Sequence, residues 1–216
     1  MMNRKKPINL FLLAISLFFI MTGCASVPSL PHTTAKPAEQ PITTPRPTTA
    51  GPYVEPGTGL VFPETLGSLV RSRDVTNYGG GGGVKIRYSG PELTAVDVYV
   101  YTAGLTGLPD VIDNPEVVKE FDDCKQAILL NRRYGAVQLD DKVTKLREDC
   151  RSSDARVSTF ALRYEGVDSI SYLYLSRYRG HFLKIRATYP RASEALAKDV
   201  LNAFLFDLAG LFWNCS

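Results

Sequence analysis

The segment Ser169–Tyr189, SISYLYLSRYRGHFLKIRATY, decides the fold because two alternating runs surround a two-residue turn. Arg179-Gly180 interrupts the alternation, and glycine permits the positive φ that tight hairpin turns require. We therefore predict antiparallel strands over Ser169–Tyr178 and His181–Tyr189. Counting outward from the turn predicts these facing pairs on the core side: Ser176 with Leu183, Tyr174 with Ile185, Tyr172 with Ala187, and Ile170 with Tyr189.

The opposite face of this hairpin mixes charged and apolar side chains, so we expect it to be only partly covered. With an alternating run earlier in the chain, it supplies a candidate basic strip: Lys85, Arg87, Arg177, Lys184 and Arg186. Lys85 and Arg87 share one face of their strand because they are two residues apart. If the strands are near neighbours, the strip suits anionic headgroups or an acidic partner. A solvated outer face without a ligand is the alternative.

The remaining periodic segments complete an α+β pattern. Strands are predicted over Leu66–Tyr78, Val84–Tyr88, Ala95–Tyr101, Tyr134–Asp140 and Arg156–Glu165, and helices over about Asn114–Gly135 and Arg191–Trp213. The first helix presents Val117, Phe121, Cys124 and Ile128 on its buried stripe, and the second presents Leu196, Val200, Phe204 and Leu208. We predict an antiparallel sheet of about six strands, in the order β-β-β-α-β-β-β-β-α, packed by two main helices.

The N-terminus resembles a bacterial lipoprotein leader. Arg4-Lys5-Lys6 is a basic start, Leu10–Met21 is an apolar run of about a dozen residues, and Met21-Thr22-Gly23-Cys24 resembles a lipobox. We expect residues 1–23 to be a signal peptide and Cys24 to carry lipid that holds the protein on a membrane. An uncleaved helical anchor, or secretion with Cys24 as a plain thiol, are the alternatives.

Residues 24–57 form a predicted linker and 58–216 a single globular domain. The linker contains eight prolines interleaved with threonines, a composition that favours an extended spacer. Ala25, and not Asp, follows Cys24, which favours the outer membrane, facing the periplasm, over inner-membrane retention.

The charge balance argues against a nucleic-acid partner. The chain carries 25 Lys and Arg and 22 Asp and Glu, but three of the basic residues lie in the leader. The mature chain is therefore neutral, whereas nucleic-acid binders retain a basic excess.

No pattern indicates a catalytic, metal or cofactor site. His181 follows a turn, and the run Gly79–Gly83 leads into Val84-Lys85, where a phosphate loop needs Gly-Lys-Ser/Thr. We therefore expect no catalytic residue, no metal and no cofactor. An unrecognised hydrolase-like site remains one alternative, and an apolar cavity for a lipid or another small molecule is a second.

Three cysteines follow Cys24 in an oxidising compartment, so at most one internal disulfide forms among them. A Cys124–Cys150 pair would hold the polar segment that ends near Ser153 against the first helix. Cys215 competes as a partner for either.

Three phrases resemble a group of bacterial envelope proteins of unknown function: Phe62–Gly67 (FPETLG), Val98–Tyr101 (VYVY) and Tyr178–Arg186 (YRGHFLKIR). The order of elements is similar to that of the PsbP-like superfamily. This resemblance implies a domain that binds larger partners, and it transfers no functional residue.

The favoured hypothesis is thus a lipid-anchored envelope protein with a non-catalytic binding or accessory role. Its partners would be the membrane, through Cys24, and another envelope component. The final helix is apolar nearly all round, so some of Leu205, Phe206, Phe212 and Trp213 should remain outside the core. Phe212 and Trp213 are the candidates for an apolar contact with a partner or the bilayer.

Overall fold

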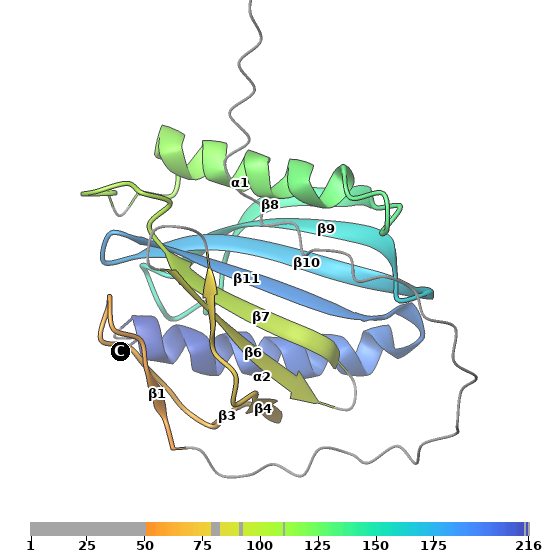
Figure 1. Ribbon diagram of the computed structural model, residues 1–216, viewed down its shortest axis with the longest axis horizontal. Coiled ribbons are helices and arrows are strands. Elements are labelled where there is room, and N and C mark those ends of the chain that lie inside the picture. Colours follow the sequence, from red (N-terminus) through yellow and green to blue (C-terminus); the bar gives the residue numbers. More distant parts are fainter. Residues whose placement is uncertain (1–50, 79–82, 91–92, 110, 214, 216) are drawn as a thin grey trace, which may run out of the picture.

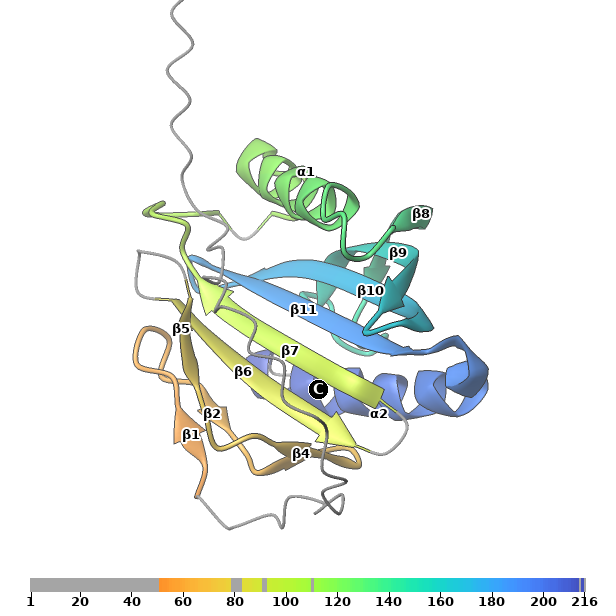
Figure 2. The same cartoon turned by 45° about the vertical axis from the view of Figure 1, so that its right-hand side comes forward.

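A computed structural model describes residues 51–78, 83–90, 93–109, 111–213 and 215. One large twisted sheet lies between two helices, with α1 across one face and α2 along the other (Figure 1). The turned view in Figure 2 shows the same three layers. The α+β class and the two packing helices are therefore confirmed.

The elements follow one another along the chain as β1 (Tyr53–Val54), β2 (Val61–Phe62), β3 (Thr65–Leu66), β4 (Leu69–Arg71), β5 (Thr76–Tyr78), β6 (Gly83–Gly90), β7 (Leu93–Tyr101), α1 (Pro115–Leu129), β8 (Val137–Lys145), β9 (Asp154–Tyr164), β10 (Val167–Tyr178), β11 (His181–Pro190), a 3-10 turn (Arg191–Ser193) and α2 (Glu194–Phe212). The large sheet has nine strands in the order β3-β4-β6-β7-β11-β10-β9-β8, with β5 also paired to β6, and β1 and β2 form a separate ribbon. Each pairing among these strands is antiparallel.

The central hairpin has the predicted register. Ser176 faces Leu183, and the pairs continue without slippage to Ile170 and Tyr189. Arg179 and Gly180 both have positive φ, 47° and 75°, as the tight turn between twisted strands requires. Local turn chemistry and the alternation of side chains therefore determine this part of the fold.

The strand count exceeds the predicted six because the region before β6 is divided. The predicted strand Leu66–Tyr78 is three short strands, β3 to β5. Gly67 turns the chain between β3 and β4 with a φ of 54°, and its N–H donates to Asp207 of α2 at 2.8 Å. The predicted strand ending at Asp140 instead continues to Lys145 as the sheet edge β8.

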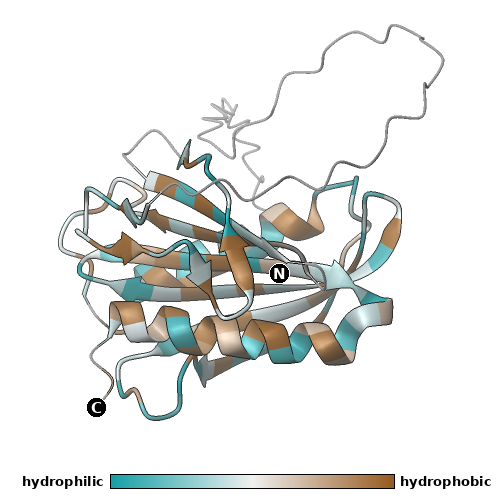
Figure 3. Cartoon of the chain, turned by 90° about the horizontal axis from the view of Figure 1, so that it is seen from below, coloured by the Kyte–Doolittle hydropathy of each residue, from teal (hydrophilic) through white to brown (hydrophobic). Residues whose placement is uncertain are grey.

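A first core lies between α2 and the sheet. The hairpin contributes Ile170, Tyr174, Leu183, Ile185, Ala187 and Tyr189, and α2 contributes Ala197, Leu201, Phe204, Leu205, Leu208, Ala209 and Phe212. Figure 3 shows α2 running along its face of the sheet with hydrophilic and hydrophobic bands. Leu196, predicted in the buried stripe, is 55% exposed, because Ala197 and Leu201 occupy the row that meets the sheet.

A second core lies under α1, on the hairpin face that we expected to be partly covered. Asn114 caps this helix by accepting a hydrogen bond from the Glu116 N–H at 2.9 Å. Val117, Phe121 and Ile128 then pack on the sheet, as predicted. Their partners are Phe160, Leu162, Leu173, Leu175 and Phe182. The helix ends at Leu129, several residues before Gly135.

The folded domain includes the last residues of the predicted linker, because β1 lies within 24–57. Tyr53 pairs with Phe62 in the β1–β2 ribbon and packs its ring 6.5 Å from the ring of Phe62. Residues 1–23 and Cys24 lie outside the described residues. In the part that is described, no helix combines the length and the apolar character needed to cross a bilayer.

Candidate functional site

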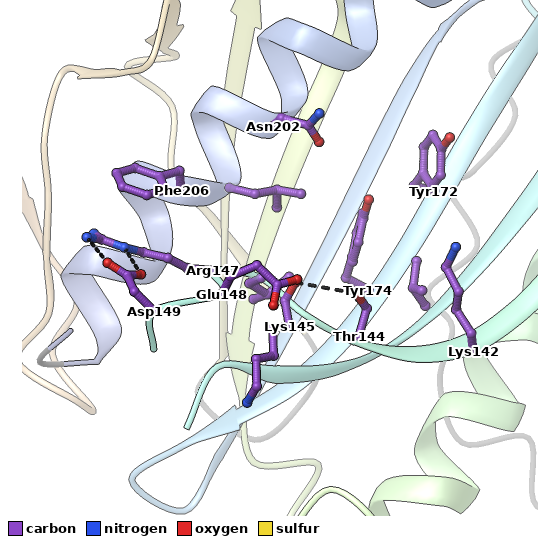
Figure 4. Close-up of a pocket in the computed structure, with 13 residues that line it drawn as sticks. Lys142, Thr144, Lys145, Arg147, Glu148, Asp149, Tyr172, Tyr174, Asn202 and Phe206 are labelled. Carbon is purple, nitrogen blue, oxygen red and sulfur yellow. Dashed lines mark hydrogen bonds and ion pairs between the residues drawn. The ribbon is translucent and has the colours of Figure 1, made fainter. Parts of the chain in front are cut away.

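A groove of about 540 Å³ lies between α2 and the β8–β10 end of the sheet (Figure 4). We call it the α2 groove. Its lining comes from β8, the following loop, β9, β10 and α2: Lys142, Thr144, Lys145, Leu146, Arg147, Glu148, Asp149, Val157, Tyr172, Tyr174, Asn202, Leu205 and Phe206. It is partly open to solvent.

Two tyrosines form the floor of the α2 groove. Tyr172 and Tyr174 are two residues apart on β10, so both project on the α2 side of the sheet. Their rings stack at a centroid distance of 5.9 Å and an angle of 22°. Burial raises the pKa of Tyr174, while Tyr172 is only partly buried. We predicted both as core residues: Tyr174 is buried as predicted, whereas Tyr172 remains partly exposed in the groove.

The outer wall is a guanidinium stacked on an exposed ring. The Cζ atom of Arg147 lies 3.8 Å from the centroid of the Phe206 ring, which belongs to α2. The Phe206 residue is 48% exposed. Arg147 also donates to both carboxylate oxygens of Asp149, at 2.6 and 2.8 Å. Phe206 is therefore one of the terminal-helix residues that remain outside the core, as expected.

The loop that carries Arg147 is held in place by its own hydrogen bonds. The Ser153 hydroxyl donates to the Arg147 carbonyl at 2.8 Å and accepts from the Arg147 N–H at 3.2 Å. The N–H of Leu146 donates to the Ser153 carbonyl at 2.9 Å. The loop is thus closed on itself, which gives the groove a defined wall.

A disulfide fastens the same loop to the end of α2. Cys150 pairs with Cys215, so the predicted Cys124–Cys150 bond is wrong and the competing partner is correct. Cys124 is a free thiol on the sheet-facing side of α1, whereas Cys150 is bonded to the end of the chain beyond α2, on the other side of the sheet. Sequence spacing could not distinguish these pairings because the bond closes across 65 residues.

The cations at the groove are paired with nearby carboxylates. The Nζ atom of Lys145 lies 3.0 Å from Oδ1 of Asp154, and the Nζ atom of Lys142 lies 3.3 Å from Oδ2 of Asp140. Arg147 is likewise paired with Asp149, so the groove has neither a strongly positive nor a strongly negative electrostatic potential. Its chemistry is therefore aromatic and amphipathic.

The predicted basic strip is brought together by the register but is not a solvated surface. Lys85, Tyr99 and Lys184 lie in one row across β6, β7 and β11, and Arg87, Asp97 and Arg186 in the next. Lys184 and Arg177 are buried under α1 and the preceding loop, whose Pro109 carbonyl accepts from Arg177 at 3.0 Å. Arg87 binds Asp97 at 2.7 Å. The prediction of one continuous exposed strip that binds headgroups is therefore wrong, because α1 covers part of the strip.

Lys184 is the centre of a buried polar cluster. Its Nζ atom donates to the Tyr78 hydroxyl at 2.6 Å and lies 4.4 Å from the ring centroids of both Tyr78 and Tyr99. The Tyr101 ring is 5.2 Å away and the Cys124 Sγ 3.8 Å away. Burial raises the pKa of the Cys124 thiol to about 11, although the Lys184 charge opposes this shift. Cys124 is therefore a neutral thiol near pH 7.

The end of α2 corrects another expectation. Phe212 is 4% exposed and packs edge-on against Phe62 and Tyr178. Trp213 is partly buried beside Phe212. Phe212 is therefore core, because the N-terminal strands β1 and β2 supply the layer that the helix pattern alone could not reveal. Phe206 takes the exposed position instead.

The remaining candidates stay outside the groove. The Nδ1 atom of His181 lies 3.0 Å from the Arg179 carbonyl oxygen of its own turn. Residues 79–82 of the glycine run lie outside the described residues. Across the residues that are described, no three His, Cys, Asp or Glu side chains gather as a metal site requires.

No protein-family model and no curated protein matches the chain. Among solved structures, a crystal structure of a protein of unknown function from Pseudomonas aeruginosa is similar over 70% of this chain and 92% of its own. The sequence identity is 13% and the TM-score 0.35.

Proposed function

We propose that the protein is a bacterial lipoprotein, anchored through Cys24 in the outer membrane and facing the periplasm, whose folded domain binds a protein partner without catalysis. The leader motif and the proline-rich spacer support the anchor. A spacer of this composition allows a domain to stand away from the bilayer and reach a partner in the envelope.

The observation that carries the binding role is the composition of the α2 groove. It joins a stacked tyrosine floor to a half-exposed Phe206 beneath the Arg147 guanidinium. Tyrosine and arginine are enriched where protein interfaces are energetically strongest, since both give large contact areas with a polar end. The paired cations fit a partner segment of low net charge. A polypeptide with an apolar anchor residue is therefore the proposed occupant.

The proposed family assignment is the PsbP-like superfamily and the similar group of envelope proteins. It rests on the three sequence phrases and on the order of elements. Binding of larger partners, which that resemblance implies, agrees with an open groove as the functional surface.

The anchor is tested by Cys24→Ser in the source cells. The variant should lose all labelling by a fatty-acid analogue and accumulate as unprocessed precursor, because no thiol remains to accept the lipid. Cys124→Ser, which alters a cysteine outside the leader, should keep the label. Labelling of Cys24→Ser at the wild-type level contradicts the lipoprotein assignment.

The groove is tested by placing a photo-crosslinking residue at position 206 or 196 of α2. Both native side chains are exposed and apolar, at 48% and 55%, but only Phe206 lines the groove. A protein should be captured from position 206 and not from 196. Phe206→Ser should then weaken binding of that protein by roughly tenfold, as loss of an aromatic anchor does, and Leu196→Ser should not. Equal capture from the two positions contradicts the groove as the binding surface.

A further inference from the structure

A second, smaller cavity of about 110 Å³ lies on the α1 side of the sheet, over β6, β7 and β11. Strands β6, β7, β11 and β9 and the segment after α1 line it with Arg87, Ala95, Asp97, Tyr99, Arg186, Thr188, Tyr164 and Tyr134. Because the α2 groove is on the other side of the sheet, this cavity is a separate feature of the molecule. Its volume suits a chemical group of several non-hydrogen atoms and not a drug-sized ligand.

The cavity has one carboxylate for two guanidinium groups. Arg87 donates to both oxygens of Asp97, at 2.7 and 2.8 Å, which satisfies that carboxylate in a bidentate pair. Arg186 donates through Nε to the Ser171 hydroxyl at 3.0 Å. Within the described ranges, the two terminal nitrogens of Arg186 have no protein acceptor. The cavity therefore has a net charge of about one positive unit, located on Arg186.

The tyrosines around Arg186 hold this cation without neutralising it. The guanidinium Cζ lies 5.4 Å from the Tyr134 ring, and the Tyr134 and Tyr164 rings are 6.1 Å apart. The Arg163 N–H donates to the Tyr134 carbonyl at 2.7 Å, which ties the segment carrying Tyr134 to β9. Burial lowers the pKa of Arg186, with the tyrosines and Asp97 opposing that effect. A partly buried guanidinium with unused donors is stabilised by an incoming oxyanion.

We propose that this cavity binds the carboxylate group of a small acid or of a peptide terminus, with the two terminal nitrogens of Arg186 as donors. A planar carboxylate matches the guanidinium fork in a bidentate arrangement. Its single charge balances the net charge of the cavity, whereas a phosphate dianion would leave an excess negative charge beside Asp97. The body of the ligand lies at the mouth, against Tyr134 and Tyr164.

The test titrates the full mature chain with acetate, N-acetylalanine, N-acetylalanine amide and inorganic phosphate, following backbone amide signals by NMR. The two carboxylates should cause saturable shifts at Asp97 and Arg186, with dissociation constants on the order of 1–10 mM for such small probes. The uncharged amide should cause none. Tighter binding of N-acetylalanine than acetate identifies a peptide terminus as the source, and the reverse order a free acid. Tighter binding of phosphate than of both carboxylates overturns the assignment.

Two variants with opposite expected effects keep the test independent of folding defects. Arg186→Gln removes the cation and should weaken acetate binding at least tenfold, while Asp97→Asn removes the competing negative charge and should tighten it severalfold. Lys142→Gln, in the α2 groove, is the matched control and should bind as wild type does. Unchanged acetate shifts in Arg186→Gln, or no saturable shift in the wild-type chain, would overturn the proposal.

Discussion

Replacing Cys150 and Cys215 together by serine is expected to lower the free energy of unfolding by about 4 kcal/mol, the chain-entropy value for a bond that closes a loop of this length. The bond spans 65 residues, from the loop after β8 to the end of α2. For a domain of this size the melting temperature should fall by about 8–16 °C. Thermal and urea unfolding of the wild type with and without reductant, and of the double variant, measure the effect.

The double variant supplies its own control. Reductant should lower the stability of the wild type to that of the Cys150→Ser/Cys215→Ser chain and leave the variant unchanged. A reductant effect of equal size in the variant would show that a disulfide between the Cys124 residues of two chains contributes, because Cys124 is the one thiol left when Cys24 carries lipid. A double variant as stable as the wild type would contradict the proposed role of the disulfide.

The same bond should also affect binding in the α2 groove. The loop from Leu146 to Ser153 forms the groove wall. Once the disulfide is removed, the loop is held by its hydrogen bonds, by the burial of Leu146 in the first core and by the Arg147–Phe206 contact. We expect the wall to become mobile before the domain unfolds, because loops fastened by few contacts open locally at low free-energy cost. Faster amide exchange in this loop at a temperature where the core remains protected would demonstrate it.

The central hairpin could be predicted from the sequence because every determinant is local. Arg179 and Gly180 specify a two-residue turn, and the period of two in β10 and β11 then permits one register. The α2 side of this hairpin is core, as the alternation indicates. The division of β3, β4 and β5 could not be predicted, because the turn at Gly67 is set by a contact with Asp207, 140 residues away.

The candidate sites depend on long-range packing and were largely hidden in the sequence. Tyr172 and Tyr174 look like ordinary core residues in the alternating pattern, and only the limited coverage by α2 leaves a groove over them. Arg186 appeared as one member of a basic strip. The two residues have different surroundings because α1 covers the row of the sheet that contains Lys184 and leaves a cavity over the next row, which contains Arg186. The predicted strand ended at Asp140, five residues before the end of the edge strand β8, because both faces of β8 are polar or exposed and give no clear alternation.

Lys184→Met is expected to lower the free energy of unfolding by about 2–3 kcal/mol, through loss of a charge-assisted hydrogen bond and of contacts with three aromatic rings. Methionine fills a similar volume, so little of the effect comes from a cavity. The gain from no longer burying a charge offsets part of the loss. Lysine is 8% exposed here, and its Nζ atom is surrounded by Tyr78, Tyr99 and Tyr101.

Lys85→Met is the matched control, because Lys85 lies in the same row of the sheet on the far side of Tyr99 and is only partly buried. It should change the stability by less than about 0.5 kcal/mol. Urea unfolding of the two variants and the wild type measures the difference. Equal stability of Lys184→Met and wild type would mean that the aromatic cluster gains nothing from the cation.

The thiol of Cys124 provides a second measurement that a purely steric role for Lys184 would not affect. Its pKa is about 11 in the folded protein, against an ordinary value of 9, with burial as the main cause and the Lys184 charge opposing it. Without that charge the pKa should rise further, so alkylation of folded Lys184→Met at pH 10 should be slower than that of wild type. Because the pKa is raised on folding, the Cys124 thiol contributes its full share to the free energy of unfolding below pH 9. This contribution is lost as the pH rises toward 11. An unchanged rate of alkylation in folded Lys184→Met would show that the Lys184 ammonium group does not affect the ionisation of the thiol. The 3.8 Å contact between Nζ of Lys184 and Sγ of Cys124 would then have no electrostatic consequence.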